Sequence, residues 1–138
     1  MSTSDLCLCG SGIKQKDCCD PYIKGDKLPP TAEALMRSRY VAYATGNDDY
    51  LLQTWHSTTR PEDESPTAGD VQWIGLQILS TEQGSESDDE GVVEFRARCR
   101  IDDTAAGLDE RSEFVREDGR WFYVDGTAIQ PQRTRENR

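Results

Sequence analysis

Residues 114–124 read Phe-Val-Arg-Glu-Asp-Gly-Arg-Trp-Phe-Tyr-Val. The pair Asp118-Gly119 separates two runs rich in aromatic and β-branched residues, a pattern typical of a β-hairpin with a two-residue type I′ turn. In that register Arg116 faces Trp121, close enough for a cation–π contact. The stretch therefore predicts two antiparallel strands.

Two earlier stretches alternate with the twofold period of a half-buried strand. The alternating apolar residues are Ile74, Leu76 and Ile78 in the first stretch, and Val93, Phe95, Ala97, Cys99 and Ile101 in the second. Each stretch predicts a strand with one face toward the core, which also assigns Cys99 to the core. The segment 82–91 between them carries five acids and no base, so we expect a solvated hairpin loop there.

Before these strands the apolar period is helical. Thr31 is a plausible N-cap, apolar residues recur at positions 32, 35, 36, 40 and 43, and Gly46 is expected to end the helix. Asn47 is expected to cap a second helix that ends by about Ser57, with Leu51, Leu52 and Trp55 pointing inward. Two helices followed by an antiparallel sheet predict an α+β fold in which the sheet curls over the helices.

The charge of the chain is unevenly distributed. Its 138 residues include 26 acidic and 16 basic ones, for a net charge of -10. All four lysines lie within residues 1–30 beside four aspartates, whereas beyond residue 30 there are 22 acids and 12 arginines. An acidic body repels phosphate backbones, so we expect no extended nucleic-acid interface. The absence of a long apolar run and of a signal-peptide pattern predicts a cytoplasmic protein without a membrane contact.

Four of the five cysteines lie within the stretch Cys7-Leu-Cys9-Gly-Ser-Gly-Ile-Lys-Gln-Lys-Asp-Cys18-Cys19. A structural zinc site takes four thiolate or imidazole ligands in a tetrahedron, and two close cysteine pairs joined by a turn meet that need. We therefore predict one structural Zn²⁺ bound by Cys7, Cys9, Cys18 and Cys19. Because four protein ligands leave no coordination position for water, we do not expect a catalytic metal.

Three other interpretations of the cysteines remain open. Crowded cysteines form disulfides in small secreted proteins, but cytosolic thiols are kept reduced. A redox-active pair more typically has C-x-x-C spacing near a βαβ unit, which this sequence lacks. Unliganded thiols are the remaining alternative.

The pattern C-x-C-G-S-G-x-K-x-x-x-C-C resembles the SEC-C motif, best known from the C-terminus of the SecA translocation motor. The matching residues are Cys7, Cys9, Gly10, Ser11, Gly12, Lys14, Cys18 and Cys19. The resemblance implies zinc bound by the four cysteines and, as in SecA, a surface that binds a partner protein. Lys14 and Lys16 are then candidate contacts to an acidic protein surface or to an RNA phosphate.

The body of the chain resembles the YchJ-like family of uncharacterised bacterial proteins, whose central domain has the cone-shaped fold of nuclear transport factor 2. The resemblance rests on Ala34-Leu-Met-Arg-Ser-Arg-Tyr40, Asp49-Tyr-Leu-Leu52, Thr54-Trp-His-Ser57 and Gly119-Arg-Trp-Phe-Tyr-Val-Asp-Gly126. It implies a SEC-C module and linker over residues 1–28, a domain of this fold over 29–130 and a flexible tail over 131–138. Many members carry a second, C-terminal SEC-C motif, whereas no cysteine follows Cys99 here, so we do not expect a function that needs two zinc modules.

The same resemblance implies a pocket between helices and sheet, which related folds use for binding or for catalysis. Its candidate residues are Arg37, Arg39, Trp55, His56 and Arg60. A buried Arg39 would need an acceptor, either an acid such as Glu113 or Asp125 or an anionic ligand. His56 is a candidate acid–base group, although an imidazolium at a helix end would also suit the helix dipole.

These observations support three hypotheses. The first is a non-catalytic adaptor that binds a protein partner through its zinc module. The second is a small-molecule-binding or enzymatic domain that uses a pocket near Arg39 and His56. In the third, the zinc module only stabilises the fold and the open face of the sheet forms an oligomer.

Overall fold

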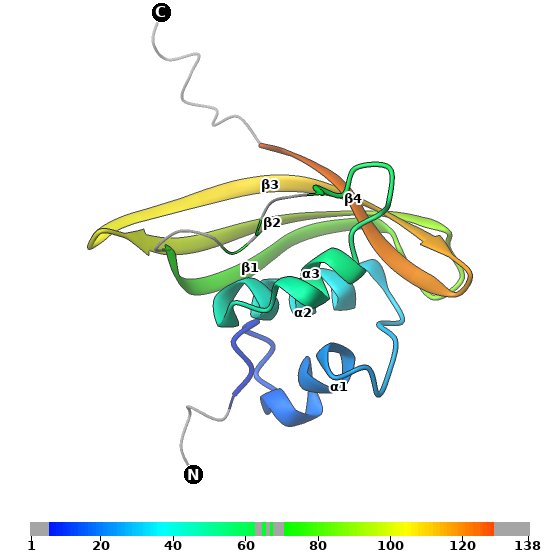
Figure 1. Ribbon diagram of the computed structural model, residues 1–138, viewed down its shortest axis with the longest axis horizontal. Coiled ribbons are helices and arrows are strands. Elements are labelled where there is room, and N and C mark those ends of the chain that lie inside the picture. Colours follow the sequence, from blue (N-terminus) through cyan, green and yellow to red (C-terminus); the bar gives the residue numbers. More distant parts are fainter. Residues whose placement is uncertain (1–5, 63–64, 66, 68–70, 129–138) are drawn as a thin grey trace, which may run out of the picture.

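The computed structural model describes residues 6–62, 65, 67 and 71–128. A curved antiparallel sheet forms one layer, helices α2 and α3 lie against one of its faces, and the N-terminal segment with α1 lies on the far side of the helices (Figure 1). The α+β prediction is thereby confirmed. The expected tail, residues 131–138, lies outside the described residues.

The sheet is a meander in the order β1-β2-β3-β4, with every neighbouring pair antiparallel. Its strands are β1 (Val71–Gln83), β2 (Glu90–Ile101), β3 (Thr104–Glu117) and β4 (Arg120–Ala128). The predicted turn at Asp118-Gly119 joins β3 to β4 and pairs Arg116 with Trp121, whose ring centroid lies 5.7 Å from the Arg116 Cζ atom.

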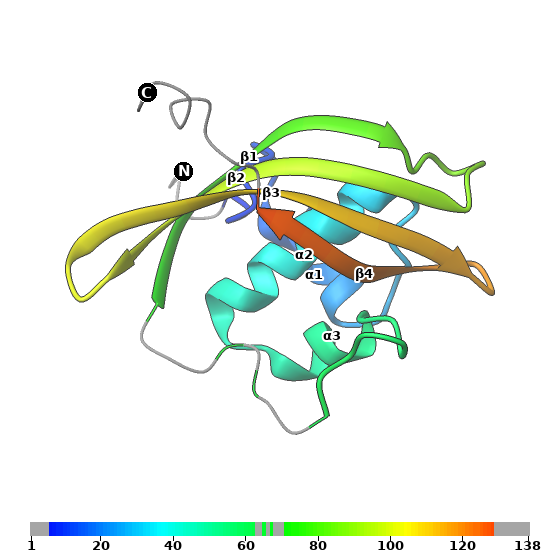
Figure 2. The ribbon, with the colours of Figure 1, turned by 90° about the horizontal axis from the view of Figure 1, so that it is seen from above.

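The first half of β3 carries no clear alternation and was not predicted. Asp102 and Asp103 both adopt positive φ, 51° and 65°, so they form a tight turn in place of the usual Asn-Gly or Asp-Gly. The resulting β2–β3 hairpin projects beyond α2 (Figures 1 and 2). The loop between β1 and β2 is shorter than expected, because strand pairing continues to Gln83 and resumes at Glu90.

Strand β1 departs from the predicted alternation. A register shift between Trp73 and Gly75 leaves Ile74 exposed. Trp73 instead packs against α2, where its ring lies 6.1 Å from that of Tyr40 and 6.2 Å from that of Tyr43. Because of the bulge, the Trp73 indole takes the inward position that the alternation predicted for Ile74.

Helix α2 (Ala32–Thr45) has the predicted ends. The Thr31 hydroxyl accepts a hydrogen bond from the Ala34 N–H at 3.0 Å, and Gly46 follows the helix with φ of 77°. The start of the helix is tied to the sheet, because the Ala32 N–H donates to the Gly84 carbonyl at 3.0 Å and the Trp121 indole donates to the Pro30 carbonyl at 3.1 Å.

Helix α3 (Asp48–Gln53) ends four residues before the predicted Ser57. The chain after it pairs with β4: the Tyr123 N–H donates to the Thr54 carbonyl at 2.8 Å, and the His56 N–H donates to the Tyr123 carbonyl at 2.7 Å. Because the Thr54 carbonyl and the His56 N–H bond to β4, they are not available for the hydrogen bonds of a further helical turn. Trp55 therefore lies in a bridge to the sheet, and His56 does not close a helix.

Candidate functional site

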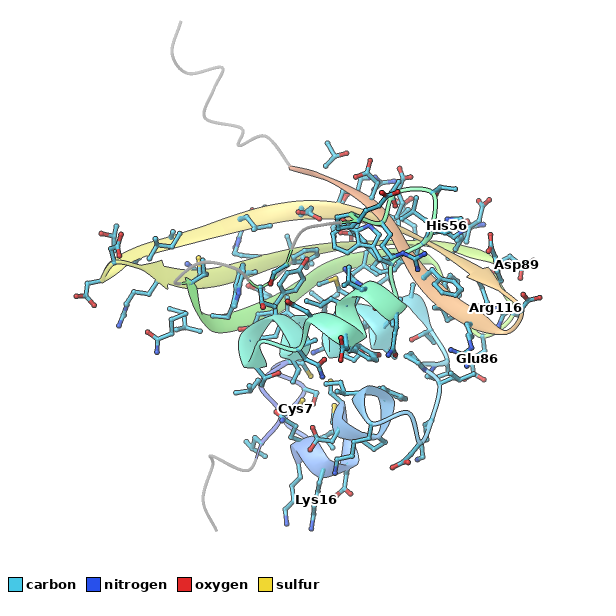
Figure 3. The ribbon with its side chains drawn as sticks, viewed as in Figure 1. Cys7, Lys16, His56, Glu86, Asp89 and Arg116 are labelled. Atoms are coloured by element: carbon cyan, nitrogen blue, oxygen red, sulfur yellow. The ribbon has the colours of Figure 1, made fainter. Side chains whose placement is uncertain are left out.

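The four N-terminal cysteines come together from two short segments. A tight turn, closed by the Cys7 N–H donating to the Ile13 carbonyl at 2.7 Å, presents Cys7 and Cys9. Cys18 and Cys19 lie between the 3₁₀ helix η2 (Gln15–Asp17) and α1 (Asp20–Ile23). Figure 3 shows Cys7 in the segment that faces α2.

The spacing of the four sulfurs suits one metal ion. All four Sγ atoms lie within 4.8 Å of one another, with Cys9 and Cys18 separated by 3.8 Å and Cys18 and Cys19 by 3.9 Å. A tetrahedron with Zn–S bonds of about 2.3 Å has S···S edges of about 3.8 Å. All five cysteines of the chain are free thiols, so the cluster is not a disulfide pair. The donor set can hold a metal, and its SEC-C pattern suggests zinc.

The surroundings of Cys9 favour a thiolate, the form that binds metal. The pKa of Cys9 lies below its ordinary value chiefly because the neighbouring thiol of Cys19 donates a hydrogen bond to its sulfur, and Ser11 and Arg37 add to the effect. Cys9 is also fully buried. Ser11 and Arg37 can keep donating when Cys9 binds a metal, whereas Cys19 is itself a predicted ligand and would give up its proton.

Arg37 belongs to this centre. Its Nη1 atom donates to the Cys9 carbonyl at 2.9 Å and lies 3.7 Å from the Cys9 sulfur, while its Nε donates to Glu33 at 2.9 Å. Arg37, predicted as a pocket residue, thus lies at the cysteine loop and is not among the residues that line the cavity described below. Arg37 and Arg39 are two residues apart on α2, so they point to nearly opposite sides of the helix. No local pattern indicates that the partner of Arg37 is the cysteine loop 28 residues away.

The cysteine module packs on the body of the protein. Cys7, Cys9 and Cys19 are buried in the same core cluster as the apolar face of α2. Gly10 adopts φ of 84°, and a Cβ atom there would lie 3.1 Å from the Leu76 carbonyl oxygen of β1. Glycine at this position thus serves both the turn and the close contact with the sheet. The module is an integral part of the fold.

The outward side of the module is both apolar and basic. Lys14 and Lys16 are exposed, and Lys16 points away from the body (Figure 3). Leu6, Leu8 and Ile13 are between 40% and 50% exposed. The cysteines thus point inward while the intervening residues of the same turn face solvent.

A second feature is a cavity of about 220 Å³ between α2 and the sheet. Its walls are mainly apolar and aromatic, with Arg39, Glu110 and Ser112 as the polar groups other than tyrosine hydroxyls. Its lining residues are Met36, Arg39, Tyr40, Tyr43, Trp73, Phe95, Ala97, Leu108, Glu110, Ser112 and Tyr123. Sequence reasoning identified Arg39 alone among the polar groups, because residues 104–113 of β3, which include Glu110 and Ser112, carry no strand pattern.

Arg39 is only 2% exposed. Its Nη1 atom donates to the Leu51 carbonyl at 2.8 Å and to the Thr54 hydroxyl at 2.7 Å. Its Cζ atom lies 5.1 Å from the Trp55 ring centroid and 4.6 Å from that of Tyr123. Burial lowers the pKa of this guanidinium.

The expected acid partner of Arg39 is not found. Within the part of the chain that the structure describes, no carboxylate lies within salt-bridge distance of Arg39, and neither Glu113 nor Asp125 bonds to it. Glu113 is exposed because β3 turns it to the face opposite Ser112 and Phe114. The cation is held by neutral oxygens and aromatic faces instead.

The other predicted pocket residues lie outside the cavity lining. Trp55 stacks on the far side of Arg39 and its indole N–H is buried without a partner in the described structure. Arg60 is exposed. The His56 Nδ1 atom accepts the Thr58 N–H at 3.2 Å, so its Nε2–H donates to Glu117 at 2.9 Å. His56 therefore joins a turn to β3, well removed from Cys7 in Figure 3.

None of the helices among the described residues combines the length and apolarity that crossing a membrane requires.

Comparison with known proteins agrees with this architecture. Residues 31–126 match the family model described as the YchJ, middle NTF2-like domain. The chain is 56% identical to a UPF0225 protein of Chromobacterium violaceum over 125 residues, which cover 87% of this chain and 90% of that one. It is 46% identical to a UPF0225 protein of Streptomyces coelicolor over 123 residues, covering 89% and 95%.

Two solved structures are similar over most of the chain. A SEC-C motif containing protein from Rhodopseudomonas palustris, solved in solution, has a TM-score of 0.82 and 33% identity, covering 90% of this chain and 98% of that one. A protein with a cystatin-like fold from Caulobacter vibrioides has a TM-score of 0.55 and 13% identity over 78% and 93%. With its cysteine module packed against a helices-on-sheet body of this kind, the chain belongs to the YchJ-like family and carries a SEC-C motif at its N-terminus.

Proposed function

We propose that this protein is a non-catalytic adaptor whose N-terminal module binds one structural zinc ion and contacts an acidic protein segment. The observation that carries the proposal is that the two sides of the module differ in chemistry. All four sulfurs lie within 4.8 Å of one another, a spacing that suits a tetrahedral ion, and Lys14, Lys16 and three apolar side chains face solvent. A four-thiolate centre is closed to water and substrate, so the ion contributes stability and the outer surface contributes contacts.

The outer surface suits a protein segment that carries both acidic and apolar side chains. Exposed Leu6, Leu8 and Ile13 offer area for apolar burial, and the two lysines attract acids and orient the partner. The relative in Rhodopseudomonas palustris is also described as a SEC-C motif containing protein, and the resemblance to the motif of SecA supports the same use.

A photo-crosslinking residue at Ile13 tests the contact. Ile74 is the matched control, because it is 49% exposed on β1 while Ile13 is 50% exposed on the module. We expect a discrete protein adduct from position 13 that is absent from position 74. The adduct should disappear in the variant Lys14→Glu/Lys16→Glu and persist in Lys24→Glu/Lys27→Glu, which reverses two other exposed lysines. Equal adducts from positions 13 and 74 would contradict the proposal.

Metal analysis tests the zinc half separately. One zinc per chain is expected in the purified protein, and chelation should unfold residues 6–23 because three of the four thiols are buried in the core. Protein that lacks zinc and keeps the same N-terminal fold after chelation would refute the zinc centre.

A further inference from the structure

The cavity between α2 and the sheet holds two opposite charges on different walls. Arg39 extends from α2 and Glu110 from β3, and both line the same space. In the described part of the chain these two groups form no salt bridge with each other. A buried cation and a carboxylate that share a cavity without pairing leave a site for a ligand that carries both complementary charges.

Tyr123 lies next to both charged groups. Its ring centroid lies 4.6 Å from the Arg39 Cζ atom. At its other end, a Cβ atom built on Gly126 would overlap the Glu110 carboxylate and lie 3.0 Å from the Tyr123 hydroxyl. Arg39 and Glu110 thus both lie beside the Tyr123 side chain. An α-ammonium and a carboxylate, about 3 Å apart and each with a hydrogen bond of about 2.9 Å, bridge groups up to about 9 Å apart.

The Glu110 carboxylate is held in place from two sides. The Ser112 hydroxyl donates to its Oε2 atom at 2.9 Å. On the β4 side, Gly126 leaves the space that the carboxylate occupies, since any side chain there would displace it. A carboxylate oriented in this way is a fixed acceptor at the cavity wall.

The size and lining of the cavity select the rest of the ligand. A volume of about 220 Å³ equals about seven water molecules at the density of the liquid, which is smaller than most sites for drug-sized ligands. Tyr40, Tyr43, Trp73 and Phe95 supply aromatic walls, so the uncharged part of the ligand is apolar. Leu108 is 37% exposed and lies on the β2–β3 hairpin, which makes this end the side open to solvent.

We propose that the cavity binds a free α-amino acid with an apolar side chain, of the size of leucine or phenylalanine. The carboxylate bonds to Arg39, the α-ammonium bonds to Glu110, and the side chain lies among the aromatic walls. This proposal does not rest on the partner-binding role of the cysteine module, because none of the cavity residues belongs to that module.

Isothermal titration calorimetry on the full zinc-loaded chain tests it. The probes are L-leucine and L-phenylalanine, with 3-phenylpropanoate and 2-phenylethylamine as analogues that each lack one charge. We expect one site per chain for at least one of the amino acids, and affinity at least about tenfold lower for both analogues, which corresponds to about 1.4 kcal/mol. No saturable binding of either amino acid at about 1 mM would overturn the proposal, and so would equal affinity for 3-phenylpropanoate, which cannot use Glu110.

Variants connect binding to the cavity. Glu110→Gln should weaken binding at least tenfold (about 1.4 kcal/mol), whereas Glu113→Gln, the same change on the exposed face of the same strand, should not. Ala97→Leu should abolish binding by filling the space while both charges remain, because Ala97 is 2% exposed and lines the cavity. Thermal unfolding of each variant without ligand identifies a loss of binding that is due to misfolding. Equal weakening by the changes at positions 110 and 113 would overturn the assignment.

Discussion

The Arg37 guanidinium donates a hydrogen bond of 2.9 Å to the carbonyl of Cys9 and lies 3.7 Å from its sulfur. Helix α2 therefore contacts the cysteine centre directly, and two residues further on the same helix places Arg39 in the core behind it. Hydrogen bonds from a fixed cation spread the charge of a metal-bound thiolate and orient the ligand.

Removing that donor should weaken metal binding without destroying the centre. We expect Arg37→Ala to lower the zinc affinity about 10- to 100-fold, the range typical of residues that support metal ligands. Competition with a chromophoric chelator measures the affinity. Glu33→Gln is the control, since it removes the acid that pairs with Arg37 but touches no cysteine. If both variants bind zinc as tightly as the wild type, the hydrogen bond has no role in metal binding.

The four clustered cysteines should differ from the fifth. Cys18→Ser replaces a thiolate with a poor zinc ligand, so we expect loss of stoichiometric zinc and a lower unfolding temperature. Cys99→Ser alters another thiol, buried on β2 outside the cluster, and should retain one zinc per chain. Elemental analysis of both purified variants decides the matter. Full zinc content in Cys18→Ser would remove Cys18 from the ligand set.

Arg39 should matter for stability apart from any ligand. Arg39→Ala removes two hydrogen bonds and two cation–π contacts, and it leaves the buried Leu51 carbonyl with one donor fewer. We expect a loss of about 2–4 kcal/mol in the free energy of unfolding, measured by urea denaturation. Arg60→Ala, at an exposed arginine, should stay within about 0.5 kcal/mol of the wild type. Similar losses in both variants would show that the burial of Arg39 is not the cause.

Two glycines offer a test of backbone strain. Gly46 follows α2 with φ of 77°, whereas Gly75 on β1 has no positive φ, and a Cβ atom would meet nothing within 4 Å at either site. Gly46→Ala should therefore lower the free energy of unfolding by about 1 kcal/mol, because an L side chain is strained in this conformation. Gly75→Ala should be neutral or slightly stabilising. Thermal unfolding compares the two, and an equal effect would rule out strain as the reason for Gly46.

Local signals predicted the parts of the fold that depend on neighbouring residues. The cap at Thr31, the helix end at Gly46 and the hairpin at Asp118-Gly119 each rest on hydrogen bonds or φ values within a few residues, and all three are present. Prediction failed where distant segments compete for the backbone. Helix α3 ends early because Thr54 and His56 bond to Tyr123, and Ile74 is exposed because β1 bulges against β2.

The candidate sites divide in the same way. The cysteine cluster was predictable from sequence because two close pairs separated by eight residues can meet around one ion with little help from the rest of the chain. By contrast, only the tertiary structure separates Arg37, which lies at the cysteines, from Arg39, which lies at the cavity, and brings Glu110 into the lining of the same cavity. Sequence by itself determined both ends of α2, the hairpin of β3 and β4, and the sulfur donors, since their geometry is local. The packing of α2 between the cysteine module and the sheet decided that Arg37 lies at the cysteines and Arg39 at the cavity. Burial and the direction of a side chain are properties of the assembled core.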